Sequence, residues 1–145
     1  MKITVDASVF VARLLPEEKL HNAAGAFFAV CDAAGHLLLL PSIGIPEVCG
    51  AIARRKRDPA MADLARVRLI QTPRLRIIPV SERLAEGAAR LASRLFLRGA
   101  DAIYCRVAQN DGTELVTFDR EVVDRTKGVL KVISPQEWLL EQAAN

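Results

Sequence analysis

The sequence is poor in two residue types that often carry chemistry. Histidine occurs only twice in 145 residues, as His21 and His36. Neither lies in an acidic motif, so a mechanism that relies on histidine as general acid and base is disfavoured. Aromatic residues make up 5% of the chain, which is too few for a surface that stacks several nucleobases. Any chemistry must therefore depend on other side chains.

Cysteine is also scarce, and its pattern excludes two common uses. The three residues are Cys31, Cys49 and Cys105, an odd number with no C-x-x-C pair. Each lies among small or apolar neighbours on an expected helix. We therefore expect three buried thiols that act as small hydrophobic residues, and neither a disulfide framework nor a cysteine metal site.

Long apolar runs are missing as well. The longest stretches without a formal charge, such as residues 33–46, fall short of the roughly 18 apolar residues that span a bilayer. At the N-terminus, Asp6 places a carboxylate where a secretory signal needs its uninterrupted apolar region. We therefore expect no membrane segment and a cytoplasmic protein.

What the chain does contain is enough apolar sequence for a continuous core. Hydrophobic residues make up 51% of the chain, and its length is typical of one compact domain spanning residues 1–145. The formal charge is +3, and 15 of the 20 basic residues are arginine. Because the planar arginine fork suits phosphate oxygens, this composition weakly favours a nucleic-acid partner.

Short apolar segments alternate with segments of helical spacing along the whole chain. The expected strands are 2–5, 36–40, 75–80, 114–118 and 131–133, the last being the weakest. The expected helices are 7–15, 18–34, 45–56, 59–71, 81–95, 101–110, 121–125 and one that begins at 134. This alternation predicts an α/β fold of three layers, with a mainly parallel central sheet of four or five short strands between helices.

The last expected helix carries a strong start signal. Ser134 can cap it, Pro135 suits its first position, and Glu137 completes a capping box. Trp138 follows directly, and we expect it to pack this helix against the core and not to stack on a base.

Four acidic residues stand in apolar surroundings. Asp6 and Asp119 each follow an expected strand, whereas Glu47 and Asp101 lie near the start of expected helices. Taken singly, each has an ordinary interpretation as a helix cap or first-turn acid. However, burying an unpaired carboxylate costs several kcal/mol, so four such residues together indicate a shared cation. In a parallel sheet, the carboxyl ends of the strands are where a ligand would bind.

The same motifs resemble a known family. The segments are Val5-Asp6-Ala7-Ser8, Ile45-Pro46-Glu47-Val48, Gly99-Ala100-Asp101-Ala102-Ile103-Tyr104 and Val116-Thr117-Phe118-Asp119-Arg120. In this order and spacing they resemble the PIN-domain ribonucleases, in particular the VapC-type toxins of VapBC toxin–antitoxin systems, over nearly the full length. The resemblance implies that Asp6, Glu47, Asp101 and Asp119 are the catalytic, metal-binding acids. It also implies that Ser8 and Thr117 support them, while Asp124 is left outside the set as a surface residue.

The chemistry of such a set is that of a hard divalent cation. Mg²⁺ prefers oxygen ligands and commonly joins carboxylates to a substrate phosphate, and Mn²⁺ can replace it. A metal-activated water would then attack an RNA phosphodiester in line and leave a 5′-phosphate and a 3′-hydroxyl. Arg54 lies seven residues after Glu47, and Arg13 seven after Asp6, so each pair would share a helix face. We expect these two arginines to contact RNA.

The resemblance further implies partners and leaves alternatives open. It implies a VapB-like antitoxin that places an Arg or Lys among the carboxylates, and a homodimer. One alternative is a non-catalytic PIN-like module that binds RNA or protein. Another is a receiver-type phosphotransfer domain, but this would require an acidic pair after the first strand and a lysine after the last. The sequence has a single Asp6, and Lys131 precedes the last strand.

Overall fold

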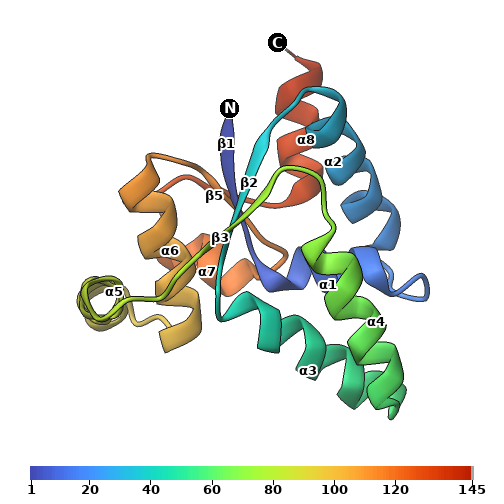
Figure 1. The fold of residues 1–145 in the computed structure, drawn as a ribbon. Coiled ribbons are helices and arrows are strands. Elements are labelled where there is room, and N and C mark those ends of the chain that lie inside the picture. The colour runs from blue at the N-terminus through green and yellow to red at the C-terminus, as the bar shows by residue number, and fades with distance from the viewer. Residues whose placement is uncertain (145) are drawn as a thin grey trace.

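The computed structural model of the chain, which describes residues 1–144, is built on a five-stranded parallel sheet (Figure 1). The strand order is β3-β2-β1-β4-β5, and every neighbouring pair is parallel. The strands are β1 (Lys2–Val5), β2 (Leu37–Pro41), β3 (Leu75–Ile78), β4 (Leu115–Val116) and β5 (Val132–Ile133). The predicted mainly parallel α/β sheet of short strands is confirmed.

β1 lies at the centre of the sheet, between β2 and β4. Thr4 is level with Leu39 of β2 on one side and with Leu115 of β4 on the other. Ile3 and Val5 are completely buried. A strand that is covered on both faces needs this continuous apolar sequence, because neither face meets water.

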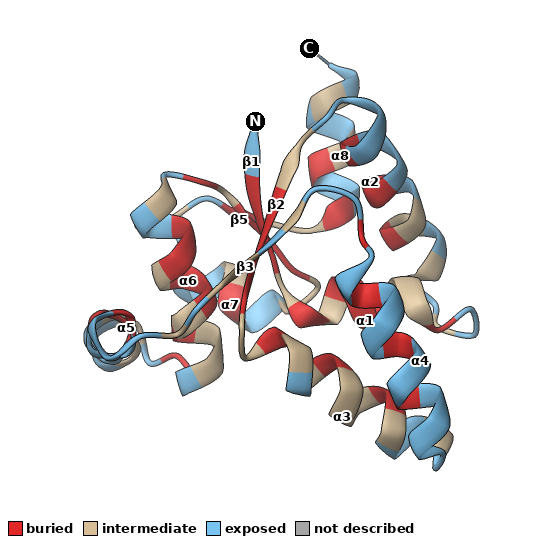
Figure 2. Cartoon of the chain, viewed as in Figure 1, coloured by how far each residue is buried: buried red, intermediate tan, exposed pale blue. Residues whose placement is uncertain are grey.

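Eight helices flank the sheet in the described part of the chain. They are α1 (Ala7–Leu14), α2 (His21–Ala33), α3 (Gly44–Lys56), α4 (Pro59–Ile70), α5 (Glu82–Leu95), α6 (Gly99–Asp111), α7 (Arg120–Arg125) and α8 (Pro135–Ala143). In Figure 1, α5 and α6 lie to the left of the strands and α2, α4 and α8 to their right. Figure 2 shows that buried residues gather on the strands and on the helix faces turned toward them.

Two helix starts differ from the prediction by two or more residues. The second helix begins at His21 and not at Glu18, because residues 16–20 form turns and Glu17 and Glu18 pair instead with Lys56 and Arg55 of α3. α6 begins at Gly99, two residues before the predicted start.

The C-terminal helix begins as the sequence predicts. Ser134 caps α8 by accepting the backbone N–H of Glu137 at 3.2 Å, and the Glu137 carboxylate accepts the backbone N–H of Ser134 at 2.8 Å. Trp138 is fully buried, with its ring 5.0 Å from that of Phe27. Its indole N–H donates to Glu114 at 2.7 Å. The helix is thereby fixed to the core by one aromatic side chain.

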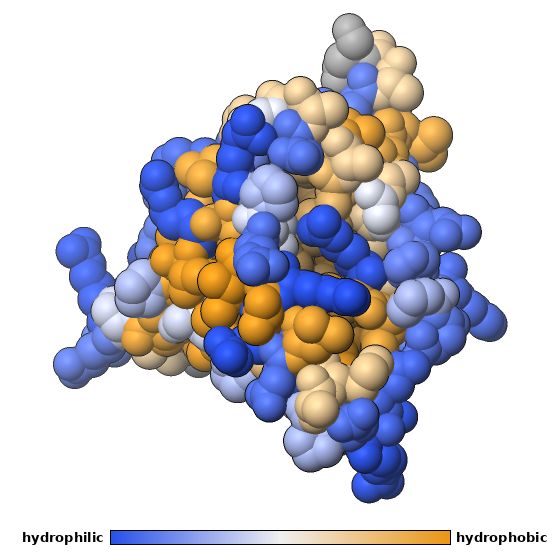
Figure 3. Space-filling view, turned by 45° about the vertical axis from the view of Figure 1, so that its right-hand side comes forward, coloured by the Kyte–Doolittle hydropathy of each residue, from blue (hydrophilic) through white to orange (hydrophobic). Residues whose placement is uncertain are grey.

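The surface is mixed, with apolar patches between charged side chains (Figure 3). Met61, Leu64 and Ile70 of α4 are among the exposed apolar residues. Cys31 and Cys105 are buried and Cys49 is half-buried, so the prediction that all three are buried is wrong for Cys49. Within residues 1–144, none of the helices has the length and apolar character needed to cross a membrane.

Candidate active site

A pocket of about 910 Å³ opens where β1 and β4 end. Its walls come from α1, from one side of α3, from the first turns of α6 and from the residues that precede α7. All four acids singled out in the sequence line it, together with Ser8: they are Asp6, Glu47, Asp101 and Asp119. Residues that are far apart in the chain are thus brought to one cavity by the parallel topology.

Asp6 is held at the base of this arrangement. It follows β1 with an extended backbone and caps α1, so its carboxylate accepts the backbone N–H of Ser8 at 2.9 Å. The Thr117 hydroxyl donates to the same oxygen at 3.2 Å. Burial raises the pKa of Asp6 despite these hydrogen bonds, and the nearby Asp101 carboxylate raises it further. The fold therefore holds a carboxylate where its charge is costly, as expected of a cation ligand.

A small hydroxyl network joins the ends of β1 and β4. Ser8 accepts the backbone N–H of Phe118 at 3.2 Å and lies 3.5 Å from the Thr117 hydroxyl. Thr117 in turn accepts the backbone N–H of Asp119 at 3.1 Å. Asp119 caps α7 through the backbone N–H of Glu121, at 2.9 Å. Ser8 and Thr117 thus position the two acids that follow the central strands.

Glu47 enters the pocket from the first turn of α3. The buried Tyr104 hydroxyl donates to its carboxylate at 2.9 Å. Burial raises the pKa of Glu47, and the Tyr104 hydrogen bond opposes that shift. Gly44 leaves room for this contact, since a Cβ there would stand 2.9 Å from the Tyr104 oxygen and 2.4 Å from Leu40. Sequence reasoning missed Tyr104 as a partner of Glu47, because the two residues are 57 positions apart.

Asp101 and Asp119 are joined by an arginine that the sequence alone did not single out. Arg98 precedes α6, and its Nε donates to Asp101 at 2.8 Å. Its Nη2 donates to Asp119 at 2.5 Å. The spacing of three residues between Arg98 and Asp101 was an available signal for the first contact. Nothing in the sequence indicated the second, which spans 21 residues.

The donor set suits a hard divalent cation by its chemistry. Four carboxylates that face one cavity supply only oxygen ligands, the type that Mg²⁺ prefers. Over residues 1–144, however, no three acidic, histidine or cysteine side chains converge closely enough to hold an ion in their present rotamers. Among residues 1–144, the half-buried Asp6 carboxylate has hydroxyl and N–H partners but no cationic one, which is consistent with a metal ligand.

The two arginines predicted to contact RNA lie in different places. Arg54 lines the acidic pocket, and its guanidinium lies back along α3, where a Cβ at Gly50 would stand 3.2 Å from it. Arg13 does not line this pocket, and its guanidinium lies 4.3 Å from the centre of the Phe28 ring. Asp6 and Arg13 do not share a helix face as predicted, because Asp6 is the N-cap of α1 and has an extended backbone. Its side chain accepts a hydrogen bond from Ser8.

Asp124 lies outside the pocket, as expected from its place in a short helix. It is exposed and pairs with Lys127 at 2.8 Å. This hydrogen bond and the ammonium charge lower the pKa of Asp124, the opposite of the shift at Asp6. Asp124 is therefore an ordinary surface acid and a useful control for substitutions in the pocket.

These features define an α/β protein with an acidic pocket at the carboxyl ends of its central strands. Comparison with known families gives a more specific assignment, because the PIN domain matches residues 3–128. The chain belongs to the PIN-domain family. The resemblance inferred from the four acidic motifs is thereby confirmed. No match was found among curated protein sequences.

Solved structures with the same fold include toxins of toxin–antitoxin systems. PAE2754 from Pyrobaculum aerophilum is 25% identical, with a TM-score of 0.71, over 100% of this chain and 91% of its own. VapC20 from Mycobacterium tuberculosis, described as a toxin that cleaves the sarcin–ricin loop, is 21% identical, with a TM-score of 0.71, over 84% and 93%. VapBC2 from Rickettsia felis, solved with promoter DNA, is 14% identical, with a TM-score of 0.71, over 92% and 98%.

Proposed function

We propose that the protein is a Mg²⁺-dependent endoribonuclease, the toxin of a type II toxin–antitoxin pair. The observation that carries this proposal is the gathering of Asp6, Glu47, Asp101 and Asp119 on one pocket of a PIN-domain fold. Any two carboxylates held about 4 Å apart would repel by roughly 1 kcal/mol even at the dielectric of water. A set of four is therefore best explained by a divalent cation.

The four acids would hold Mg²⁺, or Mn²⁺ in its place. Bound there, the ion would supply an activated water and neutralise charge on the phosphate undergoing attack. The chain's own contribution is to fix the ligands: Ser8 and Thr117 orient Asp6, and Tyr104 orients Glu47. Ligands held in this way lose little freedom when an ion binds, which strengthens the site.

The decisive experiment is incubation of the purified protein with a structured RNA. We expect cleavage with Mg²⁺ or Mn²⁺, no cleavage in EDTA, recovery when Mg²⁺ is added in excess, and products with 5′-phosphate and 3′-hydroxyl ends. Asp101→Asn should be inactive under every condition. Cleavage that persists in EDTA or in this variant would overturn the proposal.

Two other outcomes would favour the alternative functions. Binding of RNA without cleavage would indicate a non-catalytic PIN-like module. Labelling by acetyl phosphate would indicate a receiver-type domain, although the strand order of this chain, β3-β2-β1-β4-β5, differs from the 2-1-3-4-5 order of that class.

RNA is proposed to cross the pocket from its acidic end to Arg54. Three consecutive basic residues end α3, and two of them already have acidic partners: Arg55 pairs with Glu18, and Lys56 with Glu17. Within residues 1–144, Arg54 has no ion pair and lines the pocket. A cation without a partner beside a site for phosphodiesters is suited to bind a neighbouring phosphate.

Arg54→Ala is expected to weaken RNA binding without changing the rate at saturating RNA. Loss of one phosphate contact on single-stranded RNA should lower the slope of log K against log salt by about 0.7. The measurement is a salt titration of RNA binding by fluorescence anisotropy. Arg90→Ala, which removes an exposed arginine from α5, is the control and should keep the wild-type slope. An unchanged slope in Arg54→Ala would place the RNA elsewhere.

The proposed partners are a VapB-like antitoxin and a second copy of this chain. Solved structures with this fold include toxin–antitoxin complexes, among them one from Klebsiella pneumoniae at 20% identity and a TM-score of 0.64. An antitoxin would inhibit by placing an Arg or Lys among the four carboxylates. The homodimer is proposed from the family resemblance.

A further inference from the structure

Arg98 is the one cation in the described chain that pairs with any of the four acids Asp6, Glu47, Asp101 and Asp119, and its own side chain is largely exposed. It donates through Nε to Asp101 and through Nη2 to Asp119, at 2.8 and 2.5 Å. The two acids belong to different elements, the first turn of α6 and the cap of α7. One guanidinium fork thus joins two carboxylates that the fold alone would leave to repel each other.

We propose that Arg98 is an internal stand-in for the divalent cation: it bridges Asp101 and Asp119 until a metal ion binds, and it must leave them for the ion to be coordinated. This inference rests on the proposed function, because it takes both acids as metal ligands. It adds that a side chain of the protein itself, Arg98, competes with the metal ion for Asp101 and Asp119.

On this proposal, Arg98 and the divalent cation compete for the same oxygens of Asp101 and Asp119. The Oδ2 atoms of these acids that accept from Arg98 are oxygens that would also face an ion between them. With the guanidinium in place, no three acidic side chains in residues 1–144 converge on a common centre. In the proposed metal-free state, Arg98 takes the place of an ion between two of the four acids.

Arg98 is also far more exposed than its partners. Its side chain is 67% exposed, whereas those of Asp101 and Asp119 are 16% and 28% exposed. The arginine can therefore rotate into solvent without opening the core. Ion pairs of this exposed kind contribute little free energy, so a divalent cation can displace Arg98 at modest cost.

Arg98 pairs with Asp101 and Asp119 but not with Asp6. Asp6 accepts from Ser8 and Thr117, and neither its hydrogen bonds nor its ion pairs involve Arg98. Arg98 thus neutralises Asp101 and Asp119 but does not pair with the half-buried Asp6 carboxylate. An incoming ion gains Asp6 as a ligand that the arginine does not reach, which favours exchange in the direction of the metal.

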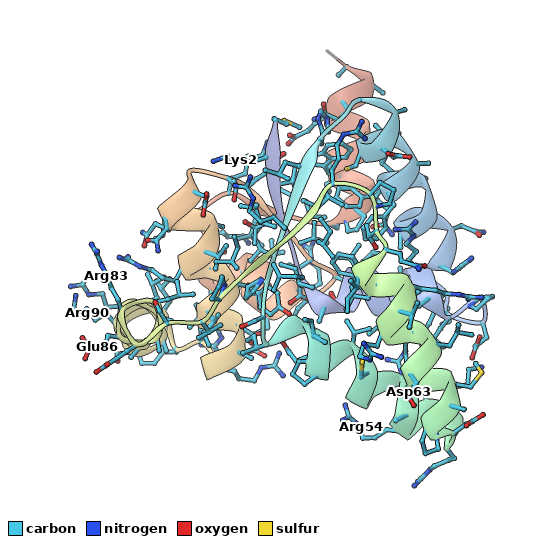
Figure 4. All side chains as sticks on the ribbon, in the orientation of Figure 1. Lys2, Arg54, Asp63, Arg83, Glu86 and Arg90 are labelled. Atoms are coloured by element: carbon cyan, nitrogen blue, oxygen red, sulfur yellow. The ribbon has the colours of Figure 1, made fainter. Side chains whose placement is uncertain are left out.

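The test compares the wild type with Arg98→Gln, Arg98→Lys and the control Arg90→Gln. Figure 4 shows Arg90 pointing outward from α5, so its loss changes net charge equally without touching the pocket. Mn²⁺ binding is measured by calorimetry in the absence of RNA. Thermal melting is measured without metal and over a series of Mn²⁺ concentrations, so that no readout depends on catalysis.

We expect Arg98→Gln to bind Mn²⁺ about fivefold more tightly than the wild type, the size of one exposed ion pair. Its metal-free form should melt lower, because Asp101 and Asp119 then repel each other, and Mn²⁺ should raise its melting temperature by more. Arg98→Lys keeps the charge but lacks the guanidinium fork. Its Mn²⁺ affinity and its metal-free melting temperature should therefore lie between those of the wild type and of Arg98→Gln. Arg90→Gln should match the wild type in both measurements.

The failure of the Arg98 bridge can be told apart from the failure of the metal site. Equal or weaker Mn²⁺ binding by Arg98→Gln, with clear binding by the wild type, overturns the role of Arg98 and leaves the metal site standing. If no variant binds Mn²⁺, the metal site itself fails, and the inference about Arg98 fails with it. A folding defect would appear as the loss of a cooperative melting transition in metal-free Arg98→Gln, and the Mn²⁺ affinities of Arg98→Lys and the wild type would then be compared instead.

Discussion

Asp6→Asn is expected to abolish RNA cleavage while leaving the protein at least as stable as the wild type. Asparagine keeps the shape of the side chain and can still accept from Ser8 and Thr117, but it cannot supply the negative charge that a metal requires. We expect the cleavage rate to fall by at least about 100-fold, equivalent to ~2.7 kcal/mol of activation free energy.

The effect of Asp6→Asn on stability follows from the sign of its pKa shift. Burial raises the pKa of Asp6 in the folded state, so the folded protein binds this proton more tightly than the unfolded chain does. Binding of this proton therefore contributes to the free energy of unfolding. The contribution is fully present below the ordinary pKa of aspartate and is lost as pH rises through the raised pKa of folded Asp6. At neutral pH the ionised carboxylate is therefore a net cost that asparagine removes.

The measurement is urea unfolding of metal-free wild type and Asp6→Asn at several pH values from 4 to 8. The wild type should lose stability relative to the variant as pH rises. Asp124→Asn is the matched control: its folded pKa is lowered, so any pH effect should have the opposite sign, and cleavage should be unchanged. An Asp6→Asn protein that cleaves RNA, or that is clearly less stable at neutral pH, would contradict this account of the pocket.

Trp138→Ala should destabilise the fold strongly. The side chain is fully buried, packs edge-on against Phe27 at 5.0 Å and donates to Glu114. Removing so large a buried ring typically costs about 3–5 kcal/mol, because it leaves a cavity as well as lost contacts. For a chain of this length, that corresponds to a fall in Tm of roughly 10 °C.

Trp138→Phe separates packing from hydrogen bonding. Phenylalanine keeps an aromatic ring but cannot donate to Glu114, whose carboxylate still pairs with Lys131 at 2.9 Å. We expect a smaller loss of about 1–3 kcal/mol, measured by denaturant unfolding. If the Ala and Phe variants were equally stable, packing against Phe27 would not be what fixes α8.

The fold was predictable because its signals are local. The apolar run before Pro41 indicates a buried strand, and the residues around Ser134 and Glu137 indicate a helix start; both are present in the structure. The predicted start of α2 was three residues too early, since residues 16–20 form turns in which Glu18 pairs with the distant Arg55, a contact that local spacing does not reveal.

The site was predictable in its charges but not in its contacts. Asp6 and Asp119 follow strands, so parallel topology alone brings them to one edge of the sheet. The bonds of Tyr104 to Glu47 and of Arg98 to Asp119 join separate elements, and their geometry depends on how those elements pack. The predicted position of Arg13 was wrong for another reason. The prediction assumed helical spacing from Asp6 to Arg13, but Asp6 is the N-cap of α1 and does not have a helical backbone.

The central position of β1 has a consequence for biosynthesis. Thr117 donates to Asp6 across 111 positions of sequence, and β4 must pair with β1 before that bond can form. At roughly 5–20 residues per second, a ribosome needs about 5–20 s to make the intervening chain. A nascent or truncated polypeptide that ends before β4 therefore carries Asp6, Glu47 and Asp101 but lacks Asp119 and the Thr117 hydroxyl that donates to Asp6. Completion of the pocket is thus coupled to nearly complete translation.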